Sequence, residues 1–223
     1  MPSPDVSELL MFDRIDAKAD PFLHFTCPEF YTPDAAAVLL DWLKTTPQWK
    51  VRRTEYWEAN AFFVTASGLS LQVQGLFSAQ LIGAVKRRLE SVYEVKLSPN
   101  IFIEAYRHED GHQTVVHTDH RPEAVGEADY LTHRVITYLN DGWDESMGGR
   151  LRMFRQPAGD AEPVLARQYA PLHNTAASLA VSERSLHQVE RMDHGRRYSL
   201  VWSFRTEDGR TQSPDARPNA FTS

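Results

Sequence analysis

The chain has 223 residues and a mass of 25.5 kDa, the size of one typical domain, which can bury a core without a disulfide or metal staple. Hydrophobic residues make up 42% of the sequence, and no apolar stretch is long enough for a membrane helix. The formal net charge of −6 argues against nucleic acid as a partner, because the phosphate backbone repels an acidic surface. We therefore expect a single globular domain over residues 1–223 that does not cross a membrane.

Cysteine and histidine are distributed very differently along the chain. The single cysteine, Cys27, excludes an internal disulfide and a Cys-rich zinc site, and it fits a reducing compartment. Residues 1–15 lack the basic and apolar segments of a secretory signal, so we expect a cytoplasmic protein. Eight of the nine histidines fall between positions 108 and 194, which is the first indication of metal chemistry.

Residues 1–98 are predicted to hold helices and the first strands. Residues 32–34 combine a capping threonine, a proline and an acid, and the leucines that follow at helical spacing predict a helix that ends before Pro47. A second helix is expected to begin near Ser78, because apolar residues then recur on one helical face. Between these helices, residues 49–65 are rich in aromatic residues and can form one or two strands.

The sequence changes to a strand pattern after Pro99. Short segments rich in β-branched and aromatic residues alternate with Gly, Pro, Asn and Asp clusters. The segments are 100–107, 113–118, 131–139, 149–155, 175–181, 185–190 and 197–205. Strands at this spacing predict a sandwich or barrel over residues 99–205. Residues 206–223 are polar and poor in aliphatic residues, so we expect a mobile tail or a lid.

A histidine and a carboxylate are spaced to act together at the start of this region. His117 and Asp119 stand at i and i+2, and in a strand such side chains project from the same face. Adding His187 would complete two histidines and one carboxylate, the ligand set that holds non-haem Fe(II) with open coordination positions. Taken alone, the His117/Asp119 pair is weak evidence, because a surface histidine near an aspartate is commonly only a solvated pair.

A second pattern follows ten positions after His187. Arg197 and Ser199 share one face of a predicted strand, and alternate residues on the other face are apolar or aromatic. A guanidinium beside a hydroxyl can bind a carboxylate, such as the free end of a dicarboxylate that chelates the metal. Arg196 is a rival that would point from the opposite face. The combination of both patterns is much more specific than either one.

In these residues the sequence resembles the Fe(II)/2-oxoglutarate-dependent dioxygenases over residues 100–205, and within them the prolyl 4-hydroxylase-like group. The local pattern is most similar to the hypoxia-sensing prolyl hydroxylases at residues 138–140, 143–144, 148–149 and 151–154. The resemblance implies a mainly β (α+β) fold. The expected architecture is a double-stranded β-helix, that is a jelly roll or cupin-like barrel, with flanking N-terminal helices.

The resemblance also implies a role for each site residue. His117, Asp119 and His187 become the catalytic iron ligands, and Arg197 becomes the salt-bridge partner of the distal carboxylate of 2-oxoglutarate. The resemblance also places Tyr138, Tyr106 and Leu151 in the co-substrate pocket. Ser199, which shares a strand face with Arg197, is assigned to the same pocket. The cofactors are Fe(II), 2-oxoglutarate and O2, with ascorbate as a reductant.

The implied reaction is hydroxylation of an unactivated C–H, with decarboxylation of 2-oxoglutarate to succinate and CO2. The substrate is an amino-acid, peptidyl or small-molecule C–H, and an intact Asp119 favours hydroxylation over halogenation. One alternative is an AlkB-like nucleic-acid demethylase, although Ser203 replaces the second arginine of that group. A metal hydrolase and a non-catalytic metal-binding jelly-roll sensor are the others. Substrate identity and oligomeric state stay open.

The sequence also predicts where several residues around this site point. Arg134 either faces the cavity mouth or solvates a strand edge, and His120 points away from Asp119. His108, like most of the remaining histidines, is expected to face solvent or to be satisfied in the core. Candidates for the substrate wall are Tyr56, Trp57, Asn60 and Phe62.

Overall fold

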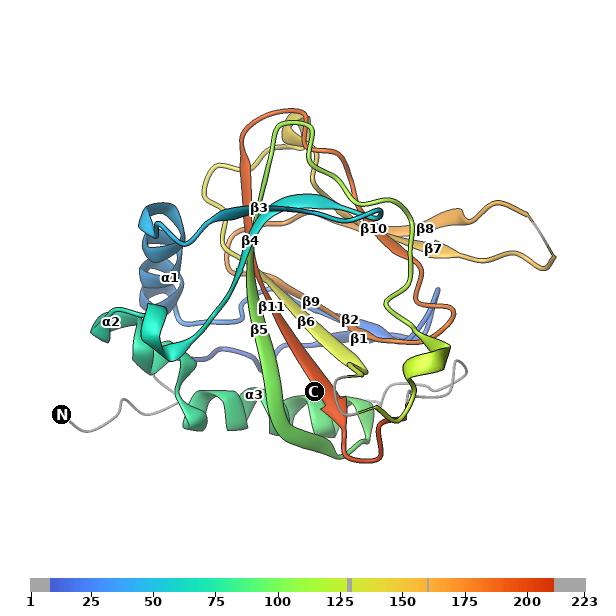
Figure 1. The fold of residues 1–223 in the computed structure, drawn as a ribbon, viewed down its shortest axis with the longest axis horizontal. Coiled ribbons are helices and arrows are strands. Elements are labelled where there is room, and N and C mark those ends of the chain that lie inside the picture. Colours follow the sequence, from blue (N-terminus) through green and yellow to red (C-terminus); the bar gives the residue numbers. More distant parts are fainter. Residues whose placement is uncertain (1–8, 128–129, 160, 211–223) are drawn as a thin grey trace.

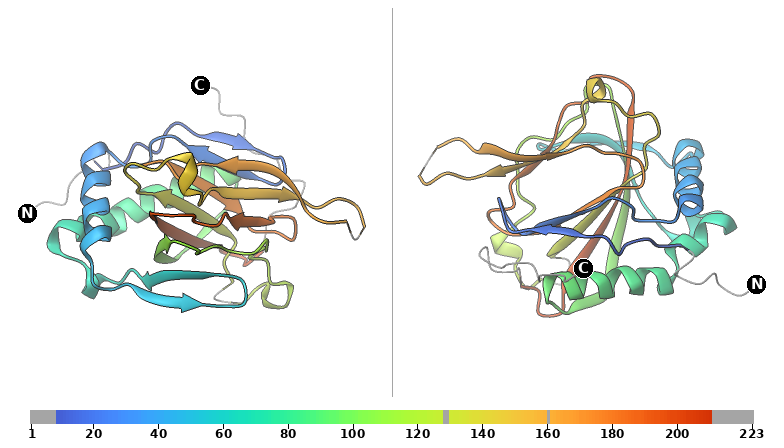
Figure 2. Two further views of the ribbon diagram at one scale, coloured as in Figure 1. Left: turned by 90° about the horizontal axis from the view of Figure 1, so that it is seen from above. Right: turned by 180° about the vertical axis from the view of Figure 1, so that it is seen from behind.

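A computed structural model describes residues 9–127, 130–159 and 161–210 (Figure 1). The described strands form two antiparallel sheets. The larger sheet has the order β1 (Asp16–Lys18), β2 (His24–Cys27), β9 (Ala176–Ala180), β6 (His133–Tyr138), β11 (Arg196–Thr206), β5 (Leu97–Glu109), β4 (Glu58–Phe63) and β3 (Lys50–Arg53). The smaller sheet has the order β10 (His187–Val189), β7 (Leu151–Arg155) and β8 (Val164–Tyr169), and β7 and β8 extend beyond the rest of the fold (Figure 2).

The two predicted helices are confirmed. Helix α1 (Pro33–Thr45) has its proline at the first helical position, and α3 (Ala79–Tyr93) is capped by the Ser78 hydroxyl, which accepts a hydrogen bond from the Leu81 amide at 3.3 Å. The short helices are α2 (Leu71–Gln74), η2 (Ala66–Gly68), η3 (Gly75–Phe77), η4 (Pro122–Ala124) and η5 (Glu145–Met147). The apolar face of α3 packs in the main hydrophobic core, against the outward face of the larger sheet. Its buried residues are Leu81, Val85, Leu89 and Val92.

Strand β11 separates this core from the interior between the sheets. Its even-numbered residues, Tyr198, Leu200, Trp202 and Phe204, lie in the main hydrophobic core. Its odd-numbered residues Arg197, Ser199 and Val201 line a cavity on the other face. The alternation predicted from the sequence is therefore confirmed, and the strand's period of two places a polar pair next to an apolar core.

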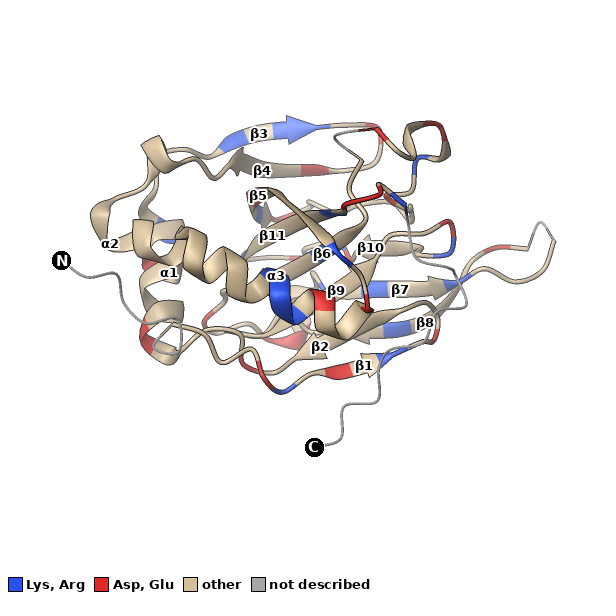
Figure 3. Ribbon diagram, turned by 90° about the horizontal axis from the view of Figure 1, so that it is seen from below, with Lys and Arg blue, Asp and Glu red and all other residues tan. Residues whose placement is uncertain are grey.

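At its outer edge the larger sheet ends in a charged strand. Lys50, Arg52 and Arg53 make β3 the basic strand visible in Figure 3. Charged residues on an edge strand discourage pairing with another chain. The two strands β3 and β4 confirm the expectation for residues 49–65, and the pairing of β4 with β5 connects this hairpin to the centre of the sheet.

The prediction of a regular strand at residues 113–118 is wrong. This segment makes only isolated bridges, between Trp57 and Thr114 and between His117 and His187. Because single bridges replace a continuous ladder here, the two sheets stay separate and do not close into the expected barrel. The jelly-roll-like, mainly β architecture is otherwise as predicted.

Three strands were not predicted, namely β1, β2 and β8. β1 and β2 are short, and β8 is largely exposed, so none of them shows a clear hydrophobic alternation. Of the predicted tail, residues 211–223 lie outside the described residues. No helix in the described part of the chain is both long and apolar enough to cross a membrane. The cytoplasmic location and the division into 1–98, 99–205 and 206–223 stay predictions.

Candidate functional site

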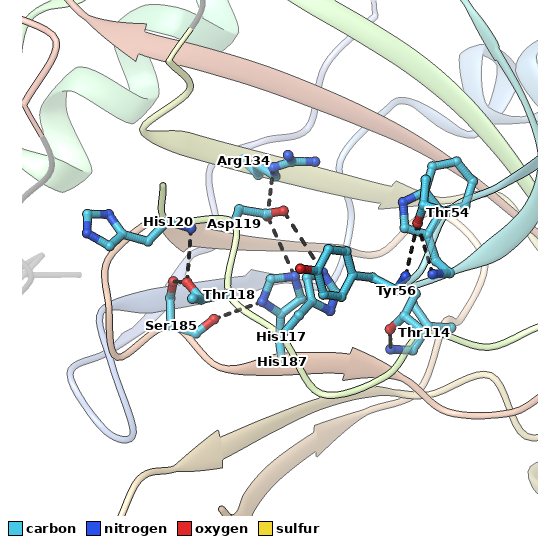
Figure 4. Close-up of polar contacts among 12 residues, drawn as sticks. Thr54, Tyr56, Thr114, His117, Thr118, Asp119, His120, Arg134, Ser185 and His187 are labelled. Carbon is cyan, nitrogen blue, oxygen red and sulfur yellow. Dashed lines mark hydrogen bonds and ion pairs between the residues drawn. The ribbon is translucent and has the colours of Figure 1, made fainter. Parts of the chain in front are cut away.

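His117, Asp119 and His187 come together although they lie on different elements. One ligand atom from each residue lies within 4.8 Å of the other two. His187 begins β10, and its backbone exchanges two hydrogen bonds with His117, at 3.0 and 2.8 Å. This bridge holds the two imidazole rings with their centroids 4.5 Å apart, and Figure 4 shows Asp119 facing both rings.

The tautomer of both histidines follows from their backbone contacts. His117 Nδ1 is 2.8 Å from the Val115 carbonyl oxygen, and His187 Nδ1 is 2.8 Å from the Ser185 carbonyl oxygen. A carbonyl oxygen only accepts, so each Nδ1 carries the proton and each Nε2 keeps a lone pair. These Nε2 atoms lie 3.9 and 3.6 Å from the Asp119 carboxylate. Three ligand atoms with free lone pairs therefore converge, as a divalent metal requires.

Charge and burial keep these groups in their metal-binding forms. Burial raises the pKa of Asp119, but Arg134 and the two histidines outweigh this effect and lower it overall. Arg134 Nε lies 2.9 Å from Asp119 Oδ2. Burial lowers the pKa of His187 to about 4, so its imidazole is neutral near neutral pH. A carboxylate and a neutral imidazole are the forms that bind a metal.

The three residues open into a cavity of about 310 Å³ between the two sheets. Its lining includes four of the predicted co-substrate residues, Tyr106, Leu151, Arg197 and Ser199. The fifth, Tyr138, lies behind this wall, with the Arg197 guanidinium 5.0 Å from its ring centroid. The other lining residues are Trp57, Glu104, His108, Thr114, Arg134, Ile136, Val189 and Val201.

Arg197 is a buried cation without an acidic partner in the described part of the chain. It is only 2% exposed, and its Nη1 lies 3.2 Å from His108 Nδ1. The Tyr138 hydroxyl is buried beside the Arg197 guanidinium, which interacts with it. A buried charge without a counter-ion is costly, so this donor set fits an anionic ligand.

Two glycines of the recognised pattern help to place Arg197. Gly148 and Gly149 have φ values of +69° and +74°, a conformation that favours glycine. A Cβ at Gly149 would lie 3.1 Å from Arg197 Cδ, and a Cβ at Gly148 would lie 2.2 Å from the Arg191 carbonyl oxygen. The glycine pair therefore lets the chain after β10 and the Arg197 side chain pack closely against this turn.

The structure places two of the four substrate-wall candidates beside the site. Trp57 lines the cavity, and Tyr56 stacks on His117 with ring centroids 6.2 Å apart. The other two candidates lie elsewhere. Phe62 packs in the main core against Trp42 and Trp49, as aromatic residues of an early strand usually do. The Asn60 amide donates to Glu109, and Asn60 does not line the cavity.

The structure also shows the direction of Arg134, Arg196 and His120. Arg134 faces the cavity, whereas Arg196 is exposed and pairs with Glu109 at 2.9 Å, so Arg197 is the arginine that reaches the interior. His120 points away from Asp119 in Figure 4, and its Nδ1 lies 2.6 Å from the Tyr130 hydroxyl.

Sequence reasoning missed His108 as a cavity residue. It was expected to face solvent or to be satisfied in the core, but it lines the cavity and contacts Arg197. One signal was available, because His108 and Tyr106 are two positions apart and share a face of β5. Glu104 lies on the same face, and its carboxylate accepts a hydrogen bond from the Tyr106 hydroxyl at 3.2 Å.

Solved structures of prolyl hydroxylases have a similar fold. A prolyl-4-hydroxylase of Pseudomonas putida is 17% identical with a TM-score of 0.65, covering 82% of this chain and 91% of that chain. A prolyl hydroxylase of Trichoplax adhaerens, in complex with a hypoxia inducible factor oxygen degradation domain peptide fragment, is 15% identical with a TM-score of 0.63, covering 84% and 85%. For a prolyl 4-hydroxylase of Phytophthora capsici the identity is 21%, the TM-score 0.59 and the coverage 82% and 59%.

The sequence alone gives a family match but no curated relative. No curated protein is significantly similar to this chain. The model of the 2OG-Fe(II) oxygenase superfamily matches residues 102–205, the segment that contains His117, Asp119, His187 and Arg197. This match covers just under half of the chain, and together with the shared fold it supports a 2-oxoglutarate-dependent dioxygenase similar to the prolyl 4-hydroxylases.

Proposed function

We propose that this dioxygenase is a hydroxylase in which His117, Asp119 and His187 hold Fe(II) and Arg197 binds the distal carboxylate of 2-oxoglutarate. One observation supports this proposal most strongly. A convergent set of three ligand atoms and a buried arginine without an acidic partner among the described residues line the same cavity. A metal hydrolase would have no use for the second feature.

The chain's own residues hold, orient and shield the reactants. Bound iron and 2-oxoglutarate would supply the oxidising chemistry, with release of succinate and CO2. Ser199 lies opposite Tyr106 on β5 and Tyr138 on β6, so three hydroxyl-bearing side chains form one row beside Arg197. Leu151 is apolar and contributes a wall that excludes water from the interior. We assign these four residues to the co-substrate site together with Arg197.

The cavity size favours a small target group. Its volume of about 310 Å³ lies at the lower end of the range of roughly 300–1,000 Å³ for ligand pockets, and iron and co-substrate must share it. We propose an amino-acid or peptidyl C–H as the target, inserted as a single side chain past Trp57 and Tyr56. The Trichoplax relative, which was solved with a peptide fragment, supports this direction. We also propose ascorbate as a reductant and a cytoplasmic location.

Turnover tests this proposal directly. The protein supplied with Fe(II), 2-oxoglutarate and O2 should release succinate, and His117→Ala and Arg197→Ala should not. A screen of amino acids and peptides should then yield a product heavier by one oxygen. A folded wild-type protein that releases no succinate with any candidate would instead support a non-catalytic sensor. A mass change found only on nucleic acid would support the demethylase alternative.

A further inference from the structure

His108 and Arg197 stand directly opposite each other on neighbouring strands. The register of β5 and β11 pairs Arg197 with His108 and Ser199 with Tyr106, and all four residues line the cavity. Side chains paired in this way have their Cβ atoms about 5 Å apart, close enough for direct contact. The contact between His108 and Arg197 is therefore built into the sheet.

The contact fixes the protonation of His108. Arg197 Nη1 lies 3.2 Å from His108 Nδ1, and a guanidinium can only donate. His108 Nδ1 must accept this hydrogen bond, so the imidazole is neutral and its proton lies on Nε2. Burial, and then the charge of Arg197, hold the pKa of His108 well below its usual range, which agrees with the geometry. Tyr106 stacks on the imidazole with an interplanar angle of 25° and restrains the ring plane.

A neutral partner has a different effect on Arg197 than a carboxylate would have. A carboxylate would form an internal ion pair and consume the charge that a ligand needs. A neutral imidazole accepts a hydrogen bond from one N–H of the buried guanidinium. It does not neutralise the positive charge of Arg197, which stays available to a ligand. In addition, the His108 Nε2–H has no hydrogen-bond acceptor among the described residues, and His108 lines the cavity.

We propose that His108 and Arg197 act together as the recognition pair for the distal carboxylate of the 2-oxo acid. His108 positions the guanidinium through Nδ1 and offers Nε2–H as a further donor in the same cavity. This inference rests on the proposed function, and it names a recognition residue that the sequence pattern did not include. The pair selects 2-oxo acids that carry a second carboxylate.

Calorimetric titration of the Mn(II)-loaded protein tests this pair. The two probes are 2-oxoglutarate and 2-oxovalerate, which has the same carbon chain without the distal carboxylate. In His108→Leu, 2-oxoglutarate should bind about 10- to 100-fold more weakly, as expected for the loss of a hydrogen bond to a charged group. Binding of 2-oxovalerate should not change. His108→Gln, which keeps a donor and an acceptor, should bind 2-oxoglutarate almost as well as the wild type.

A third variant tests the need for a neutral partner. His108→Glu places a carboxylate against Arg197 and should lose 2-oxoglutarate binding more completely than His108→Leu, while the melting temperature stays near that of the wild type. The inference is overturned if His108→Leu or His108→Glu binds 2-oxoglutarate like the wild type, or if both probes weaken together. If the Mn(II)-loaded wild type binds neither probe, the proposed function fails as well, which distinguishes the two outcomes.

Discussion

The two arginines of the cavity have opposite electrostatic surroundings. Arg134 on β6 has its Nε 2.9 Å from Asp119, so its charge is balanced by an acid of the proposed metal site. Arg197 on β11 contacts the neutral His108 imidazole and Tyr138, and no acidic side chain of the described residues pairs with it. An arginine that a carboxylate neutralises is a structural part of the site, whereas an arginine with neutral partners has its charge free for a ligand. The following experiments test this distinction.

Removing the charge of Arg197 should have the largest effect. We expect Arg197→Met to weaken 2-oxoglutarate binding at least about 100-fold, because more than one charge-assisted hydrogen bond is lost. Mn(II) affinity should stay within about twofold of the wild type, since no metal ligand contacts this side chain. Both affinities can be measured by calorimetry. The melting temperature without ligand should rise by about 2–4 °C, because a buried charge without a counter-ion is gone.

The corresponding change at Arg134 should act on the metal. Arg134→Met should weaken Mn(II) binding about 10- to 100-fold, because Asp119 loses the partner that orients it. The melting temperature of the metal-free protein should fall by at least about 4 °C, since the carboxylate is left without its cation. Tighter metal binding in this variant would mean that repulsion between the guanidinium and the metal outweighs orientation. A rise in melting temperature for both arginine variants would remove the contrast between them.

The Tyr138 hydroxyl should contribute less than the arginine beside it. We expect Tyr138→Phe to weaken 2-oxoglutarate binding about 3- to 10-fold, the size of one hydrogen bond to a ligand. Tyr31→Phe removes an equally buried hydroxyl outside the cavity and should leave this affinity unchanged. Equal 2-oxoglutarate affinities for Tyr138→Phe and the wild type would exclude Tyr138 from the co-substrate site.

The neutral state of His108 should also affect stability at acidic pH. Its folded pKa is held well below the unfolded value of about 6.5, so the unfolded chain binds more protons in this range. Its contribution to stability is therefore full above about pH 6.5 and is lost as the pH falls toward the folded pKa. In the metal-free protein, His108→Gln should reduce the fall in melting temperature between about pH 6.5 and 5 by roughly 2–4 °C per pH unit.

A matched control for this effect is His194→Gln. His194 is exposed, so its replacement removes an imidazole without changing the cavity or the core. If His108→Gln and His194→Gln show the same pH dependence, the buried imidazole is not held neutral by the fold.

The comparison also explains which parts of the site could be predicted from the sequence. The shared face of Arg197 and Ser199 depends on spacing within one strand, and local periodicity contains that information. His117 and Asp119 lie close together although their segment forms only isolated bridges, so strand periodicity does not explain their pairing. The pair of His108 with Arg197 depends on the register between β5 and β11, which are far apart in the sequence. Register of this kind is set by packing of the whole sheet and is not visible in either strand alone.

Local patterns also failed where tertiary contacts decide the outcome. Residues 113–118 have strand composition, but they lie between two sheets and form only single bridges. Phe62 has the aromatic character of a substrate wall, yet its side chain faces the main core because α1 and the Trp49 ring pack on that side of β4. Both helices were predictable because an amphipathic face follows a start signal, which is the proline at the first helical position for the helix at Pro33 and the capping hydroxyl for the helix at Ser78. The predicted cap at Thr32 was wrong, since its side chain makes no capping hydrogen bond.

The central claim is that one cavity holds Fe(II) and 2-oxoglutarate together. Anaerobic addition of 2-oxoglutarate to the Fe(II)-loaded protein, followed by visible absorption, tests it most directly. We predict a weak charge-transfer band that saturates with 2-oxoglutarate in the wild type, is absent in His117→Ala and needs far more co-substrate in Arg197→Met. A folded wild-type protein that shows no such band, or a band that persists unchanged in both variants, would contradict the assignment.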